Sequence, residues 1–123
     1  MTSFNKVIVA GRLTRDPELR YTPSGSAVGG FGLAVNRKYK HGDDVKEETH
    51  FFDIITFGKL AESCGQHLSK GTSVIVEGRL QQRRWDDKAT GQKRSKVDIA
   101  AQTVTTIGAQ GTRVSAEDQQ DHV

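Results

Sequence analysis

The side chains best suited to chemistry in this chain are aromatic and basic residues that alternate along residues 73–85. Arg79, Arg83 and Trp85 are an even number of residues apart, so they lie on one face if this segment is a β-strand. An aromatic ring beside guanidinium groups can stack on a base while the cations neutralise phosphates. A tryptophan that covers a barrel end or a subunit interface is the alternative. The inward set of the same strand would be Val74, Val76, Gly78 and Leu80.

A second aromatic set lies in residues 49–57. If Phe52 and Ile54 face the interior, the alternation places Phe51 and Phe57 outward. The alternative use of such an outward set is a protein–protein interface. Tyr39 has the parity of the inward residues Phe31, Leu33 and Val35, so it reaches a shared groove only if its strand bulges or bends before it.

Positive charge is concentrated near the first aromatic set. The chain of 123 residues has a formal net charge of only +3, yet residues 79–96 hold seven Lys or Arg against two Asp. Such clustering favours a polyanionic partner, although a solvated hairpin would show it too. Because duplex DNA hides the faces of its bases, exposed aromatics favour single strands.

No set of residues predicts catalysis, a metal site or a cofactor. The four histidines, at positions 41, 50, 67 and 122, have no ligand spacing with Cys64, the lone cysteine. His50 and Asp53 would point to opposite faces of a strand. Gly58-Lys59 lacks the upstream glycine of a phosphate loop. We therefore expect a binding protein and no enzyme, without an internal disulfide.

The elements that must position these side chains are predominantly β-strands. Hydrophobic alternation predicts strands at 4–13, 27–37, 49–57, 73–85 and 93–107, with a mobile, charged hairpin loop at 40–48. Leu60, Cys64 and Leu68 are spaced as one helical stripe within 59–68, and Gly71 would be its C′ residue. Five strands with one short helix between strands 3 and 4 predict an all-β OB-fold, a five-stranded Greek-key barrel.

The chain divides into a domain at 1–108 and a short, polar, disordered tail at 109–123. No apolar run approaches the roughly 20 residues that span a bilayer, and no secretory signal precedes the first strand. We therefore expect a soluble, intracellular protein.

Four motifs, taken in their order and spacing, resemble the bacterial-type single-stranded DNA-binding protein family from Asn5 to about Ile107. They are Asn5-Lys6-Val7-Ile8-Val9-Ala10-Gly11-Arg12-Leu13, Asp16-Pro17-Glu18-Leu19-Arg20-Tyr21, Phe57-Gly58-Lys59-Leu60-Ala61-Glu62, and Val76-Glu77-Gly78-Arg79-Leu80 running into Arg84-Trp85.

The resemblance implies a homotetramer that binds and protects single-stranded DNA in replication, recombination and repair, in the cytoplasm and on the nucleoid. It implies base stacking by Tyr39, Phe51, Phe57 and Trp85. It implies backbone contacts from Lys6, Arg12, Arg20, Lys59, Lys70, Arg79, Arg83 and Arg84. Asp53 departs from the family, in which that position is often basic, and so removes one expected phosphate contact.

The tail also departs from the resemblance. Family members typically close with an acidic tip and Pro-Phe that recruits partner enzymes, whereas this sequence closes with Gln120-Asp121-His122-Val123. Recruitment through such a tip is therefore not expected. The sequence leaves open a shortened chain, a paralogue or a phage-like member, and an OB-fold adaptor whose main partner is a protein.

Overall fold

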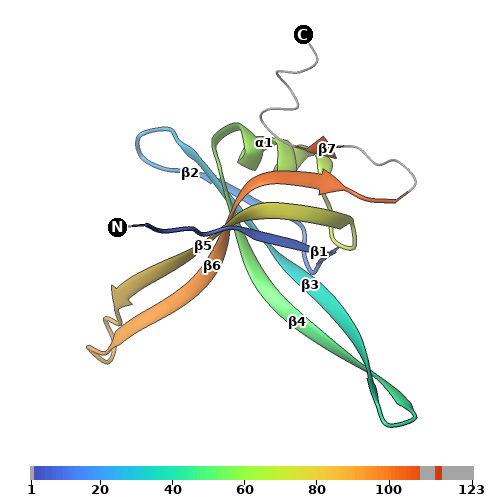
Figure 1. The fold of residues 1–123 in the computed structure, drawn as a ribbon. Helices are drawn as coiled ribbons and strands as arrows, with labels where there is room; N and C mark the ends of the chain where they lie inside the picture. Colours follow the sequence, from blue (N-terminus) through green and yellow to red (C-terminus); the bar gives the residue numbers. More distant parts are fainter. Residues whose placement is uncertain (1, 109–112, 115–123) are drawn as a thin grey trace.

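The computed structural model describes residues 2–108 and 113–114. Its elements, in chain order, are β1 (Val7–Leu13), β2 (Glu18–Tyr21), β3 (Ala27–His41), β4 (Asp44–Phe57), α1 (Gly58–His67), β5 (Ser73–Asp86), β6 (Lys93–Thr106) and β7 (Arg113–Val114). All the described strands form one sheet (Figure 1).

Five of these strands close into a barrel in the order β1-β5-β6-β4-β3, and β3 returns to β1. The closure pairs are Arg12 with Ala34 and Leu13 with Leu33. The pairing of β4 with β6 is parallel, whereas the other barrel pairings are antiparallel. The helix α1 lies between the third and fourth barrel strands, which confirms the predicted OB-fold.

The core consists of alternate residues of the barrel strands and one stripe of the helix. Phe31, Leu33 and Ile54 are fully buried, as are Val74 and Val76 of β5. The predicted helical stripe of Leu60, Cys64 and Leu68 is also buried. Burial raises the pKa of the Cys64 thiol to about 12, because the thiolate would lose its hydration there. This cysteine is a core side chain without a reactive thiolate.

Leu80 was predicted to face inward with Val74 and Val76, and this is wrong, since its side chain is about half exposed. The reason is that β5 has left the barrel at this point and continues into a two-stranded arm with β6 (Figure 1). The side chain of Asn5 marks the exit. Its amide accepts a hydrogen bond from the Leu80 N–H and donates one to the Leu80 carbonyl, both at 2.8 Å.

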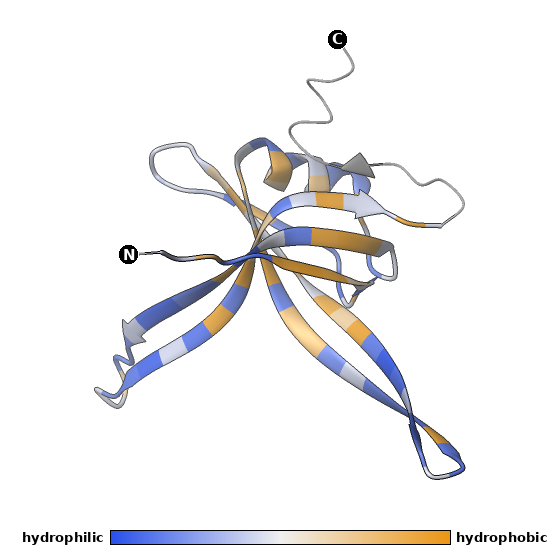
Figure 2. Cartoon of the chain, viewed as in Figure 1, coloured by the Kyte–Doolittle hydropathy of each residue, from blue (hydrophilic) through white to orange (hydrophobic). Residues whose placement is uncertain are grey.

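The hairpin predicted at 40–48 is confirmed, but its loop is much shorter than predicted. Strands β3 and β4 stay paired without interruption as far as His41 and Asp44 and leave a two-residue turn. Gly42 in that turn has a φ of 66°, the sign that a type II′ hairpin turn requires at its first central residue. The charged residues here are those of a second arm, whose outer part is largely hydrophilic (Figure 2).

Two smaller differences concern single elements. Strand β2, which pairs with the beginning of β3, was not predicted. Gly71 is not the C′ residue of α1, because the helix ends at His67 with Leu68 as its C-cap. Gly71 instead forms part of the following turn, where its N–H donates to the Leu13 carbonyl. Of the tail predicted at 109–123, only Arg113 and Val114 are described, as strand β7 against β6, and the rest lies outside the described residues.

Gly78 allows β5 and β6 to approach closely where β6 carries a bulge. The register shifts between Glu77 and Gly78, so that Thr103 and Ala101 are their successive partners. A Cβ atom on Gly78 would overlap the backbone carbonyl of Ala100 and lie about 3.0 Å from the Cα of Ala101.

We expect Gly78→Ala to lower the free energy of unfolding by about 1–3 kcal/mol, because backbone atoms must move to admit the methyl group. Gly65→Ala in α1 is the matched control. Its methyl group would have only ordinary contacts of 3.7 Å or more with Leu19, and alanine favours the helix by up to about 1 kcal/mol. Urea unfolding at a fixed protein concentration measures both. Equal stability of the two variants would contradict the close approach at Gly78.

Candidate nucleic-acid interface

The outer face of the barrel, meaning the side of the sheet opposite the core, carries two exposed phenylalanines on β4. The side chain of Phe51 is 72% exposed and that of Phe57 is 47% exposed, whereas Ile54 between them is fully buried. Phe57 ends β4 and is also the N-cap residue of α1. The two rings lie on the same side because an even number of residues separates them.

Each of these phenylalanines lies in a cross-strand row that begins with an arginine. Arg12 of β1 is opposite Ala34 of β3, which is opposite Phe51. Arg20 of β2 is opposite Val28 of β3, which is opposite Phe57. Directly opposed residues share a face. The Cα atoms of each arginine and its phenylalanine are therefore two strand spacings, about 10 Å, apart. The structure thus brings together two predicted stacking residues and two predicted phosphate contacts.

Between these rows the outer face of β3 has no side chains. Gly30 and Gly32 are opposite Ile55 and Asp53 of β4. The absence of a Cβ at Gly32 matters, because that atom would overlap the hydroxyl of Thr14 and lie 2.8 Å from the Nη1 atom of Arg15. The residues after β1 therefore cross directly over β3 toward β4.

The arm of β5 and β6 continues this outer face. Its outward residues Arg83 and Trp85 are opposite Lys96 and Arg94 of β6. Sequence alternation predicted one face with Phe51 and Phe57 and another with Arg79, Arg83 and Trp85. The parallel pairing of Ile55 with Ala100 makes these two faces one surface, because it aligns the outward residues of β4 and β6.

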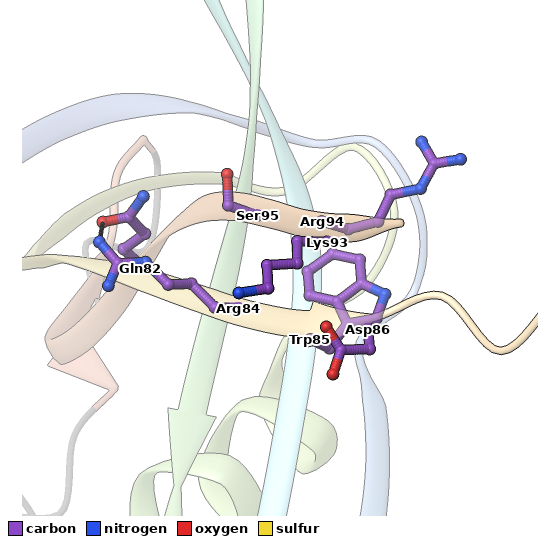
Figure 3. A pocket seen from close by; sticks show the side chains of 7 residues that line it. All are labelled: Gln82, Arg84, Trp85, Asp86, Lys93, Arg94 and Ser95. Carbon is purple, nitrogen blue, oxygen red and sulfur yellow. Dashed lines mark hydrogen bonds between the residues drawn. The ribbon is translucent and has the colours of Figure 1, made fainter. Parts of the chain in front are cut away.

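Trp85 borders a hollow of about 510 Å³ on this arm. Trp85 is 46% exposed, and Figure 3 shows its indole beside Lys93 and Asp86, whereas the guanidinium of Arg84 points toward Gln82. Arg84 alternates to the other side of β5 from Arg83 and donates a hydrogen bond of 3.0 Å to Gln82. Most of the residues that line the hollow, including Arg84, Asp86 and Lys93, alternate to the side of the arm opposite Arg83, so Trp85 borders it from the edge of the outer face, and a carboxylate lies among its cations.

The outer face also carries carboxylates, including Glu18 opposite Gly30 and Glu77 opposite Ile8, and two of them, Asp98 and Asp53, pair with cations of the β5–β6 arm. Asp98 is buried, and its Oδ2 atom accepts a hydrogen bond from the Nε atom of Arg83. Its Oδ1 atom has no hydrogen-bond partner in the described part of the chain. Asp53 forms an ion pair with Lys96 and lies 4.0 Å from Arg15. Asp53 therefore lacks a phosphate contact of its own and also pairs with two neighbouring cations, Arg15 and Lys96.

Tyr39 is placed differently from the other aromatic residues. The register of β3 with β4 runs without a bulge from Val28 to His41, so Tyr39 keeps the parity of the inward residues. The guanidinium of Arg37 lies 5.1 Å from its ring centroid, which is a cation–π contact. The two strands cross toward the hairpin turn (Figure 1). This twist rotates the face of Tyr39 relative to that of Phe51.

The remaining predicted phosphate contacts are exposed but spread over several elements. Lys6 precedes β1, and Arg79 lies on the outer side of β5. Lys59 is in the first turn of α1, beside Phe57. Lys70 lies in the turn after α1, where its backbone N–H donates to Asp16 at 2.8 Å. The structure therefore does not gather the predicted cations into one cluster but places them along the barrel and its arms.

Comparison with known proteins identifies the family. The profile described as "Single-strand binding protein family" matches residues 4–107. The chain belongs to this family. A single-stranded DNA-binding protein of Treponema pallidum is 48% identical over 119 residues, which are 96% of this chain and 66% of the relative. Proteins of the same name from Aquifex aeolicus and Thermotoga maritima are 45% and 42% identical, and the chain covers 80% and 86% of their lengths.

The described residues of this member of the single-strand binding family add one finding on metal ligands and one on membrane-spanning helices. No group of three or more His, Cys, Asp or Glu side chains in residues 2–108 and 113–114 gathers as metal ligands do. No helix in the same part of the chain is long and apolar enough to cross a membrane.

Sequence reasoning missed three charged residues of this family member's outer face, namely Arg15, Lys96 and Asp98. Asp98 had a usable signal, because a hairpin turn at 87–92 places it diagonally opposite Arg83 on the same face. Lys96 was visible only as one of the basic residues clustered in 79–96, and Arg15 had no signal. Their contact with Asp53 depends on the closed barrel, which brings the residues after β1 and the arm of β6 to β4.

We expect Arg83→Gln to lower the free energy of unfolding by about 1–3 kcal/mol, because the buried Asp98 then loses its charged partner. The double variant Arg83→Gln/Asp98→Asn should recover most of this loss, since it leaves no unpaired charge. Urea unfolding of the two variants and the wild type measures the difference. If the double variant is no more stable than the single one, Arg83 does not support Asp98 in this way.

Proposed function

We propose that this chain binds single-stranded DNA without strong sequence preference along its outer face. The observation that carries the proposal is the pair of cross-strand rows, Arg12 to Phe51 and Arg20 to Phe57, continued by Arg83 and Trp85 on the arm of β5 and β6. The names of the relatives support the same substrate.

The chemistry of the rows accounts for the substrate. Each stack of a base on an aromatic ring contributes about 1–3 kcal/mol and tolerates any base, so affinity arises without sequence readout. The arginines neutralise phosphates and release counter-ions, which makes binding weaken as salt rises. A duplex would offer phosphates to the arginines but no base faces to Phe51, Phe57 and Trp85.

The proposed role is therefore to hold and protect single strands, without a catalytic step, during replication, recombination and repair on the nucleoid in the cytoplasm. Tyr39 belongs to the proposed stacking set as an outlying contact on the β3–β4 arm. Lys6, Lys59, Lys70, Arg79 and Arg84 are the proposed contacts along the rest of the phosphate path.

We expect oligo-dT to quench the fluorescence of Trp85, the lone tryptophan, at low salt, whereas duplex DNA of equal length should not. Phe51→Ala should weaken binding by about 1–3 kcal/mol, because one stack is lost. Its folding should be unaffected, since the ring is mostly exposed. Titration of the Trp85 fluorescence with oligo-dT measures both the quenching and the affinity lost in Phe51→Ala.

Tyr21→Ala is the matched control for Phe51→Ala. Tyr21 is also an exposed aromatic, but it lies on β2 at the far end of β3 from the arms, where it is opposite Ala27. Its removal should leave the affinity unchanged. Absence of quenching in the wild type at low salt would contradict the stacking site and would favour an OB-fold adaptor that binds protein. Equal losses for both variants would contradict the assigned row.

We further propose that copies of the chain assemble, as a homotetramer, through the free edge of β1. On one side β1 pairs with β5 from Val7 to Arg12, whereas on the other side only Arg12 and Leu13 pair with β3. Residues 7–11 thus present an open strand edge that a second copy could extend. Ile8, on the outer side of this strand, is 59% exposed and would be covered by such contact.

Light scattering should give a mass near four times 13.5 kDa for the wild type. Ile8→Glu should shift the distribution to smaller species, because a charge would be buried in the contact. Val45→Glu, at an exposed apolar residue beside the hairpin turn of the β3–β4 arm and away from β1, should keep the wild-type mass. A wild-type mass of 13.5 kDa would overturn the proposed assembly without affecting the DNA-binding proposal.

A further inference from the structure

Asp53 is the unexpected member of the outer face. It lies on β4 two residues from Phe51, on the same side of the sheet, and so within the surface proposed to bind a polyanion. A carboxylate there repels phosphate, so its presence requires a compensating arrangement. The structure shows that arrangement as two ion pairs.

The first partner, Arg15, reaches Asp53 from the connection between β1 and β2. Its guanidinium passes over Gly32, the residue directly opposite Asp53, and its Nη1 atom lies 4.0 Å from Asp53 Oδ1. Glu18 also lies 3.8 Å from Arg15. A side chain at position 32 would occupy this path, so the bare face of β3 is what lets the arginine cross.

The second partner, Lys96, reaches Asp53 from the arm of β6. Its ammonium group donates to Asp53 Oδ2. Lys96 is opposite Arg83 on the same arm, and Arg83 is bound to the buried Asp98. Lys96 and Arg83 are therefore each paired with a carboxylate. The partner of Lys96, Asp53, is partly exposed, whereas the partner of Arg83, Asp98, is buried.

The exposure of Asp53 decides what its pairs can do. Its side chain is 32% exposed, and both of its partners are about half exposed. Such pairs contribute little to stability, because water screens them and the long side chains lose entropy. An incoming phosphate can therefore separate them, whereas the buried Asp98 keeps hold of Arg83.

We propose that Asp53 is an intramolecular counter-ion of the DNA-binding face, which occupies Arg15 and Lys96 in the free protein and competes with DNA phosphates for them. The inference rests on the proposed function of this face. It adds Arg15 and Lys96 to the residues that meet DNA, and it makes Asp53 a residue that limits affinity.

The test compares Asp53→Asn with Glu48→Gln. Both changes remove one negative charge from β4 and keep the shape of the side chain. Glu48 is likewise ion-paired to Arg37 at 3.8 Å, and it is hydrogen-bonded to His50 at 3.2 Å, but alternation places it on the opposite side of β4 from Asp53. A difference between the two variants therefore reports the position of the charge and not the net charge.

We expect Asp53→Asn to bind oligo-dT about threefold to tenfold more tightly than the wild type at low salt. The slope of log K against log salt should become steeper by about 0.7 for each freed cation. Glu48→Gln should keep the wild-type affinity and slope. Asp53→Glu, which keeps the charge, should remain close to the wild type.

A third variant identifies the freed cation. In Asp53→Asn/Lys96→Gln, at least half of the gained slope should disappear, because Lys96 is missing and Arg15 still has Glu18 at 3.8 Å. A double variant that keeps the whole gain would overturn the part assigned to Lys96.

Unchanged or weaker binding by Asp53→Asn would overturn the inference, as would an equal gain with Glu48→Gln. If Asp53→Asn lowers the thermal midpoint, Asp53→Ser replaces it, with the same expected direction. Failure of the proposed function is distinguishable, because the wild type itself would then not quench with oligo-dT. Normal wild-type binding with no gain in Asp53→Asn rejects the counter-ion alone.

Discussion

Two residue pairs, Ile54 with Ile99 and Ile55 with Ala100, join β4 to β6 and are the only parallel pairing among the described strands. The barrel needs them as well as the β1–β3 pairs, because they connect the strands of the first hairpin to those of the second. They also align the outward residues of the two hairpins, so that Phe51 of one and Arg83 of the other belong to one surface. The junction is short because each strand leaves it for its own arm (Figure 1). The core covers its inner side, where Ile54 and Ile99 are buried.

Two carboxylates of the outer face, Asp98 and Asp53, differ in their exposure to solvent. Asp98 is buried and depends on Arg83, so this pair belongs to the framework as much as to the binding surface. Asp53 is accessible, and its two cations are only loosely held. A basic surface for DNA thus contains carboxylates with different tasks. The buried one keeps the arm of β5 and β6 in shape, whereas the exposed one moderates the positive potential between the two arms.

Most of the fold could be predicted from local patterns. The five barrel strands follow from alternation, and α1 follows from the spacing of Leu60, Cys64 and Leu68, because each pattern reflects burial on one side of an element. The errors lie where strands leave the barrel. Leu80 is apolar and in phase with Val76, yet it is about half exposed. The polar residues at 40–48 resemble a loop, yet a two-stranded ribbon pairs them. Alternation indicates the face of a residue but not whether other strands cover that face.

The sequence by itself determined the family, the barrel with its single helix, and which aromatic side chains alternate away from the core. These properties depend on residue types at short separations and on motifs in order. Only the tertiary structure decided that Arg12 and Arg20 lie in rows with Phe51 and Phe57, that two predicted faces are one, and that Asp53 holds Arg15 and Lys96. Those contacts join residues that are distant in the chain. They follow from strand register and barrel closure, which hydrogen bonds between strands and the packing of the core establish together.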